Sequence, residues 1–246
     1  GTSRRALAVL PPETERVWSF VREQPSLAGF VLVGGTALAL HLGHRRSEDL
    51  DLVWTGIRLP RVGLDQFTRA AAEAGVPFTP HDDPAALEEF AFGGGDLRDH
   101  QQDFLAAGVV KVSFFTADAA LARVLRPGVP TGVRVADLDE LFKAKALVSA
   151  SRSRTRDWLD LYLLLRSGRF SLRDFRSAFH EAGIPQACDT ALGRLCGGVP
   201  SRGDEGFEHL LPDPPSLAQM SEFFRAERDA LQIQLAQEAA AGRAKP

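Results

Sequence analysis

The segment VLVGGTALALHLGHRRSEDLDLVW, residues 31–54, constrains the fold more than any other part of the chain. An apolar run leads through two glycines into strong helix formers, and an alternation of acidic and apolar residues follows. Alternation with a period of two is typical of a strand, whereas the middle stretch has a helical composition. We therefore expect a strand at 30–33, a helix at 36–42 and a strand at 49–54, which together form a very compact unit.

The two glycines, Gly34 and Gly35, lie where the first strand passes into the helix. Backbone N–H groups at a helix start can face an anion, and the helix dipole adds to the attraction. Thr36 could cap the helix with its hydroxyl or offer that hydroxyl to the same anion. A tight turn without any ligand explains the glycines as well. If the turn holds a phosphate, Gly35→Val should weaken nucleotide binding and leave the fold nearly intact.

The acidic strand that follows carries Asp49 and Asp51. Residues two apart on a strand point to one face, so both acids should project together while Leu50 and Leu52 enter the core. Two carboxylates so placed could share one or two Mg²⁺ ions, as in phosphoryl-transfer sites. The competing interpretation is a solvated strand edge with two acids, although like charges on one face repel unless a cation lies between them.

The rest of the first half shows further helix and strand patterns. Apolar residues at helical spacing predict helices at 12–24 and 61–75. Short apolar runs predict a strand at 90–92 and two strands, 104–106 and 109–115, joined at Ala107 and Gly108. These elements favour a mixed sheet with helices packed on it.

The second half has a different character, because nearly every segment after Asp137 is helical in pattern. A stretch rich in Gly, Pro and Asp at 197–215 predicts a long surface loop. The expected helices of this all-helical part are 137–150, 156–167, 171–182 and 216–241.

The length and composition of the chain limit the class of protein to which it can belong. The 246 residues are enough for two domains, and the change in pattern predicts an α/β domain over 1–135 and a helical domain over 136–246. A net charge of −3 argues against a protein that coats nucleic acid by bulk electrostatics. No apolar run approaches the roughly 20 residues that cross a bilayer, and the start does not read as a signal peptide, so we expect no membrane contact and a cytoplasmic protein.

The opening motif resembles a known family. GGTALALHLGHRRSEDLDL is similar to the signature of nucleotidyltransferase-fold proteins of the AbiEii/AbiGii toxin family, in which a GG or GS turn precedes H-R-x-S-x-D-[IL]-D. The resemblance implies a phosphate turn, a metal site and two nucleotide-binding residues that lead into the acidic strand. On this match they are Gly34, Gly35 and Thr36 at the turn, Asp49 and Asp51 at the metal, and Arg45 and Ser47 before the strand.

A second stretch, KALVSASRSRTRDWLDLYLLL at 145–165, is similar to the K-x-x-A…R-x-x-x-[KR]-D-[FW]-x-D-L-Y segment of the same family. Lys145, Arg152, Asp157 and Asp160 fall on the matching positions. The implied fold is α+β: a nucleotidyltransferase-type mixed β-sheet with flanking helices, followed by a C-terminal helical lobe.

The residues of this second motif also have a physical interpretation of their own. Lys145 could reach a triphosphate as a point charge, or it could be a solvated lysine beside Lys143. Asp157 and Asp160 share one face of an otherwise apolar helix, where an acid must be paired or lie near a cation. An i,i+4 salt bridge between Arg156 and Asp160 is the structural alternative.

One position departs from the expected catalytic set. Nucleotidyltransferase folds commonly carry a third carboxylate on a strand next to the acidic one, but VVKVSFF offers Ser113 there. A serine is a poor metal ligand and no base at neutral pH. Either catalysis is absent or another acid fills the role, and Asp157 is the first candidate, with Asp160 as its supporting residue.

The family resemblance implies a reaction and partners. We expect Mg²⁺-dependent transfer of a nucleoside monophosphate from an NTP to an acceptor such as tRNA or another RNA, catalysed with Asp49, Asp51, Lys145 and Asp157. The protein would be the toxin of a toxin–antitoxin pair, with a cognate antitoxin as its partner. The alternative is a catalytically inactive nucleotide-binding or interaction module with the same fold.

Overall fold

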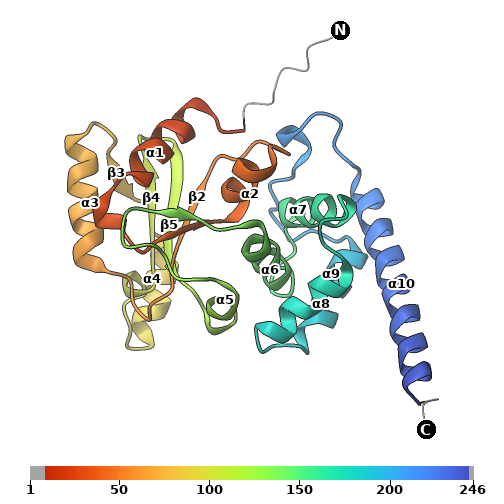
Figure 1. The fold of residues 1–246 in the computed structure, drawn as a ribbon. Coiled ribbons are helices and arrows are strands. Elements are labelled where there is room, and N and C mark those ends of the chain that lie inside the picture. The colour runs from red at the N-terminus through yellow and green to blue at the C-terminus, as the bar shows by residue number, and fades with distance from the viewer. Residues whose placement is uncertain (1–8, 244–246) are drawn as a thin grey trace. The chain divides into compact units, whose positions relative to one another are not determined.

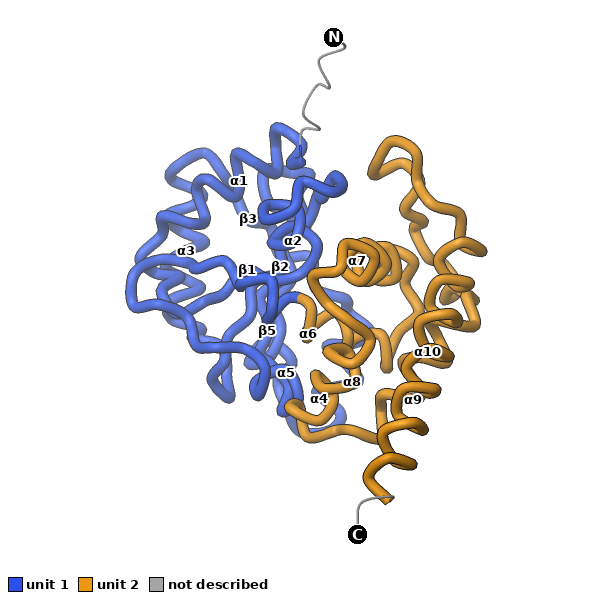
Figure 2. The backbone as a smooth tube through the Cα atoms, turned by 45° about the vertical axis from the view of Figure 1, so that its right-hand side comes forward, with its two compact units in different colours: residues 1–141 blue, residues 142–246 orange. Residues whose placement is uncertain are grey.

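The computed structural model describes residues 9–243, which form two compact units with the division between residues 141 and 142 (Figure 2). The division falls inside helix α6 (Leu138–Val148), whereas the sequence pattern changes character at 135/136. The first unit carries the sheet and the second is helical, so the expected α+β fold class is confirmed. Among residues 9–243, no helix is long and apolar enough to span a bilayer.

The first unit is built on one six-stranded sheet in the order β3-β4-β5-β2-β1-β6 (Figure 1). The sheet is mixed, because β2 runs parallel to β5 and β1 parallel to β6 while the other neighbours are antiparallel. The strands are β1 (Val31–Val33), β2 (Leu50–Trp54), β3 (Phe78–Pro80), β4 (Gln101–Ala106), β5 (Val110–Thr116) and β6 (Arg134–Val135).

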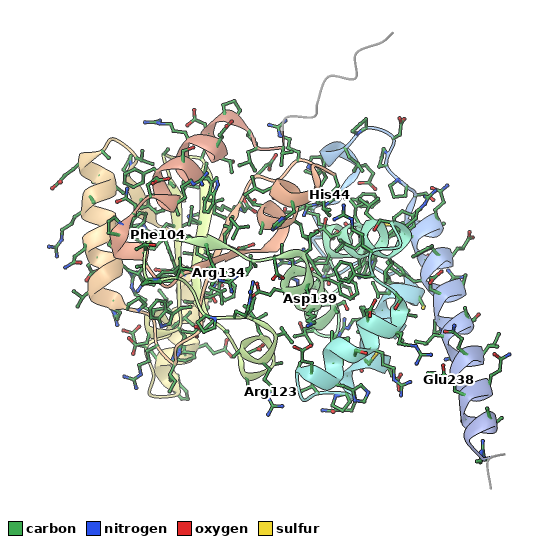
Figure 3. All side chains as sticks on the ribbon, in the orientation of Figure 1. His44, Phe104, Arg123, Arg134, Asp139 and Glu238 are labelled. Atoms are coloured by element: carbon green, nitrogen blue, oxygen red, sulfur yellow. The ribbon has the colours of Figure 1, made fainter. Side chains whose placement is uncertain are left out.

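One face of this sheet carries the core of the first unit. Phe114 of β5 lies in the middle of an aromatic cluster, 5.8 Å between ring centroids from both Phe67 of α3 and Phe104 of β4. Phe104 is labelled in Figure 3. Helix α3 therefore packs on this face. The helices of the unit are α1 (Pro12–Arg22), α2 (Gly34–Leu42), α3 (Arg61–Glu73), α4 (Pro84–Phe92) and α5 (Ala119–Val124), with short 3₁₀ turns η1 (Pro25–Leu27) and η2 (Leu97–Asp99).

The opposite face of the sheet is polar along one row. The register aligns Asp51 of β2 with Ser113 of β5, and Ser113 with Asp103 of β4. Residues directly opposite each other on paired strands point to the same face, so these three side chains lie on one face in consecutive strands. All three are half-buried.

The second unit is a bundle of helices. Helix α10 (Leu217–Arg243) packs on α7 (Thr155–Arg166), where the Tyr162 and Phe223 rings meet at 5.1 Å between centroids. An exposed ion pair of 2.7 Å joins Glu238 of α10, labelled in Figure 3, to Arg173 of α8. The remaining elements are α8 (Leu172–Glu181), α9 (Ala187–Gly197) and η3 (Glu208–Leu210).

The structure corrects two predictions of local structure. The expected strand at 90–92 is the end of helix α4, which starts with Pro84 at its first position and with the Asp83 side chain accepting a hydrogen bond from the Ala85 N–H. Helix α9 lies in a stretch for which the sequence predicted no element. It buries Cys188 and Cys196, and burial raises the pKa of the Cys188 thiol to about 11.

Candidate functional site

Helix α2 begins directly at the end of β1, without an intervening turn. Gly34 is its first residue and has φ +74°, a conformation that residues with a Cβ rarely adopt. A Cβ on Gly34 would lie 2.5 Å from Oδ2 of Asp51. The glycine therefore allows the start of the helix to approach the Asp51 carboxylate closely.

The N-cap residue of α2 supplies no side-chain cap. This residue is Val33, whose side chain accepts no hydrogen bond from the first turn. The first N–H groups of a helix lack intrahelical acceptors, and the helix dipole makes that end positive. The first turn of α2 thus has the chemistry of an anion site next to a carboxylate.

The second glycine contacts a buried arginine. A Cβ on Gly35 would collide with Nη2 of Arg45 and lie 3.2 Å from Oγ of Ser47. Arg45 is 3% exposed, and its Nη1 donates to the Arg46 carbonyl at 2.9 Å. A valine at position 35 would displace this buried guanidinium, so we expect Gly35→Val to cost stability as well as nucleotide binding.

The hydroxyls of Thr36 and Ser47 tie α2 to the segment that leads into β2. Thr36 Oγ1 donates to the Asp49 carbonyl and lies 2.8 Å from Ser47 Oγ. A hydroxyl has a single proton, so Ser47 is the donor in the second bond. Both residues are buried, and the Thr36 hydroxyl does not cap the helix.

The acidic strand has the predicted alternation. Leu50 and Leu52 are fully buried, whereas Asp49 and Asp51 are half-buried. Magnesium sites in proteins are often built from one or two carboxylates plus substrate phosphates. Asp49 and Asp51 fit that donor set, and no group of three or more His, Cys, Asp or Glu residues within 9–243 could hold a metal ion by itself.

The structure places Ser113 beside Asp51, as the sequence led us to expect, and adds an acid that the sequence analysis missed. Asp103 follows Ser113 in the same row, one strand further from Asp51. The hairpin at Ala107 and Gly108 was predicted, but its first strand was expected to start at 104, after Asp103. Extending the pairing outward from the hairpin by one more residue would have revealed this position.

The second motif forms a buried ion-pair cluster in the second unit. Lys145 Nζ lies 2.6 Å from Oδ1 of Asp157 and 3.0 Å from Oδ2 of Asp160, and Arg152 Nε lies 2.7 Å from Oδ2 of Asp157. Burial raises the pKa of Asp157, but Lys145 and Arg152 outweigh it and hold that pKa below the ordinary value. Lys145 itself is buried and not a solvated lysine.

The predicted pair of Arg156 with Asp160 is wrong. Arg156 turns to the loop after α9, where its Nη2 lies 3.2 Å from Oε2 of Glu205 and its Nε donates to the Gly206 carbonyl. Asp160 is paired with Lys145 instead. The i,i+4 rule fails here because a buried lysine from another helix provides the partner for the acid.

The two units thus hold different parts of the predicted site. The first unit brings together the start of α2, the buried segment before β2 and the two acids. The second unit brings together Lys145, Arg152, Asp157 and Asp160.

Two solved structures are similar to this chain at low identity. The crystal structure of JHP933 from Helicobacter pylori has 17% identity and a TM-score of 0.48, with 98% of this chain and 100% of that one covered. MenT4, a nucleotidyltransferase toxin from Mycobacterium tuberculosis, has 15% identity and a TM-score of 0.47, with 87% and 84% covered. No curated protein sequence matches the chain.

The sequence profile of one family matches residues 20–243, which is nearly the whole chain. That family is described as nucleotidyl transferase AbiEii toxin of type IV toxin–antitoxin systems. The match includes both motifs, the glycine and aspartate motif of the first unit and the lysine and aspartate motif of the second. The chain therefore belongs to the AbiEii family of nucleotidyltransferase toxins.

Proposed function

We propose that this chain transfers a nucleoside monophosphate from an NTP to an acceptor, with Mg²⁺ held by Asp49 and Asp51. The observation that carries the proposal is the contact between the start of α2 and the Asp51 carboxylate, which Gly34 allows. A helix start can bind phosphate through its backbone N–H groups, and the adjacent carboxylates would bind the cation that accompanies it. The combination suits a metal-bound triphosphate better than either feature alone.

The residues of the first unit would have different roles in binding the nucleotide. The N–H groups of the first turn of α2 would hold the phosphates, and Arg45, buried against Gly35, would add positive potential beneath that turn. Thr36 and Ser47 would keep the start of β2 in place through their mutual hydrogen bond. When bound, Mg²⁺ would neutralise charge on the phosphates.

The reaction would form one bond and break one. An acceptor oxygen would attack the α-phosphorus, the bond from that phosphorus to the bridging oxygen of the β-phosphate would break, and pyrophosphate would leave. Positioning and charge neutralisation supply most of the catalysis in such transfers. RNA such as tRNA is the proposed acceptor, which agrees with action in the cytoplasm, and the family implies a cognate antitoxin as partner.

Lys145 and Asp157 are the proposed catalytic residues of the second motif. A triphosphate could compete with the two carboxylates for the Lys145 ammonium, since lysine binds phosphate as a point charge. Their contacts within the second unit also explain their burial without any ligand. A measurement of activity and stability on the same variants separates the two roles.

The test is incubation of the protein with each α-³²P-labelled NTP and total RNA, with Mg²⁺ or with EDTA. Label should pass to RNA only with Mg²⁺ and should be lost in Asp49→Asn and Asp51→Asn. Asp65→Asn, on the exposed face of α3, is the matched control and should keep the activity. Transfer that survives in either site variant would exclude the metal assignment.

The alternative, an inactive nucleotide-binding module, has one observation in its favour. Ser113 occupies the place beside Asp51 where a third carboxylate would stand. Nucleotide binding without transfer to any acceptor, measured in the same experiment, would support that alternative.

A further inference from the structure

The first unit contains a second site candidate, away from the start of α2. A pocket of about 670 Å³ lies among α4, the glycines 93–95, η2 and the first residues of β4. Its size falls in the range of small-molecule sites. Figure 1 shows α4 at the end of the sheet near β4. Since Asp103 lines the pocket and shares a row with Ser113 and Asp51, the pocket opens on the polar face of the sheet.

The wall of this pocket is acidic. Four carboxylates line it, from Asp82, Asp83, Glu89 and Asp103, and the lining residues that the structure describes include neither lysine nor arginine. Two of these acids have partners: Arg98 Nη1 lies 2.7 Å from Asp82 Oδ2, and Asp83 caps α4. Phosphates and other anions would be repelled here, so the pocket does not suit the nucleotide.

One carboxylate oxygen in the wall lacks a donor. Asp103 Oδ2 accepts a hydrogen bond of 2.9 Å from Gln101, but Oδ1 is buried and accepts none from the residues that the structure describes. A buried carboxylate oxygen without a donor leaves the charge of Asp103 only partly compensated, and a cation in the pocket would lower that cost through charge attraction. The pocket therefore favours a ligand with positive charge.

The pocket also has an aromatic wall that is held in place. The centroids of the Phe90 and His100 rings are 5.7 Å apart. A Cβ on Gly95 would lie 2.5 Å from Cε1 of Phe90. Gly95 thus makes room for the ring. An aromatic face beside carboxylates attracts organic cations, because the ring quadrupole adds to the charge attraction.

Helix α4, which forms one side, is itself unusual. Its sequence PAALEEFAF is mostly apolar, yet it buries none of its residues, and Phe92 is 97% exposed. Of the apolar side chains of α4, Ala86 and Phe90 line the pocket, so a ligand with an apolar stem could contact those two.

We propose that this pocket binds an organic cation, a compound with protonated amines on an apolar stem. A metal ion is a poorer match, because no three of the described His, Cys, Asp and Glu side chains are grouped so that they could hold one. A compound with several ammonium groups could instead pair with more than one of the four carboxylates. The inference does not depend on the proposed transfer reaction.

Calorimetry with spermidine, without nucleotide, tests the proposal on the full chain. Spermidine should bind saturably, and the affinity should fall about tenfold in Asp103→Asn, the loss of one well-placed charge contact. Glu89→Gln, on exposed helix surface, should lower the affinity about threefold without a folding risk. Phe90→Leu should weaken binding by removing the aromatic face, and triethylene glycol, a neutral chain, should not bind.

The control is Asp65→Asn, which removes the same charge from an exposed site that does not line the pocket. It should bind spermidine as the parent does. Absence of saturable binding by the parent would overturn the proposal. Equal affinities of Glu89→Gln, Phe90→Leu and Asp65→Asn for spermidine would also overturn it. Spermidine would then bind by a general attraction to the acidic protein surface and not in the pocket.

Discussion

At the scale of single residues, the site depends on what each glycine makes room for. Gly34 and Gly35 are adjacent, but the first approaches a carboxylate and the second a guanidinium. The sequence indicated a phosphate turn and could not reveal these two contacts, because they join residues 34 and 35 to residues 51 and 45. The burial of Leu50 and Leu52 between the half-buried Asp49 and Asp51 was predictable, since a strand period of two follows from local geometry alone.

We predict that Gly34→Ala destabilises the protein by about 2–3 kcal/mol. The left-handed conformation costs roughly 1–2 kcal/mol for a residue with a Cβ, and displacement of Asp51 adds to that cost. Gly108→Ala is the matched control, since its φ is +78° and open space surrounds it. Urea unfolding of both variants measures the difference, and equal losses would show that the Asp51 contact contributes nothing to stability.

The buried cluster of the second unit carries the next residue-scale prediction. Asp157→Asn should lower the free energy of unfolding by about 3–5 kcal/mol, because Lys145 and Arg152 would lose a buried carboxylate partner. Asp189→Asn, exposed on α9, should have no such effect. If transfer is lost while the melting temperature stays unchanged, Asp157 is catalytic and this structural prediction fails.

At the scale of elements, the start of α6 is fixed by one carboxylate. Glu140 accepts hydrogen bonds from both Nη atoms of Arg134, the β6 residue labelled in Figure 3, and from the backbone N–H groups of Arg126 and Asp137. Burial raises the pKa of Glu140, but these donors outweigh it and lower the pKa from 4.5 to about 2. The Glu140 carboxylate thus connects the start of α6 to β6 and to the segment that precedes β6 in the chain.

This arrangement predicts a pH dependence with a definite sign. A carboxyl group with a lowered pKa in the folded state stabilises the fold fully above its unfolded pKa of 4.5, and the contribution is lost as the pH falls toward 2. The shift corresponds to about 3 kcal/mol. Glu140→Gln should therefore lose about that much stability at pH 7 and should have a flatter stability profile between pH 5 and about 2. An unchanged slope in the variant would assign the acid sensitivity to other groups.

Elements with strong local patterns were predictable, and those that depend on distant contacts were not. The strands on either side of Ala107 and Gly108 follow from alternation and turn residues. Helix α4 was mistaken for a strand at its end because Phe90 and Phe92 alternate with alanine, whereas Asp83 and Pro84 fix a helix start upstream. The partners of Lys145 could not be read from the sequence, because they come from a second helix.

At the scale of the whole molecule, the family match spans both units, while the proposed nucleotide site draws on residues of the first. Carboxylates and substrate phosphates are the ligands that Mg²⁺ prefers, so we expect Mg²⁺ with an NTP to bind at Asp49 and Asp51. A ligand that binds only the folded protein stabilises it by an amount set by its concentration and its dissociation constant. Stability of the full chain is therefore a readout of binding that does not require the acceptor to be known.

We predict that Mg²⁺ with an NTP raises the melting temperature of the full chain. At a ligand concentration one hundred times the dissociation constant, the gain is about 2.7 kcal/mol, or roughly 5–10 °C for a chain of this length. Asp51→Asn should lose the shift because it removes a carboxylate of the metal pair, and EDTA should abolish the shift in the parent. Asp65→Asn should keep the shift, since its charge lies on the exposed surface of α3. A full shift in Asp51→Asn would mean that the nucleotide binds elsewhere. The Asp51 carboxylate lies against Gly34 at the start of α2, so its loss must weaken any metal-dependent site there.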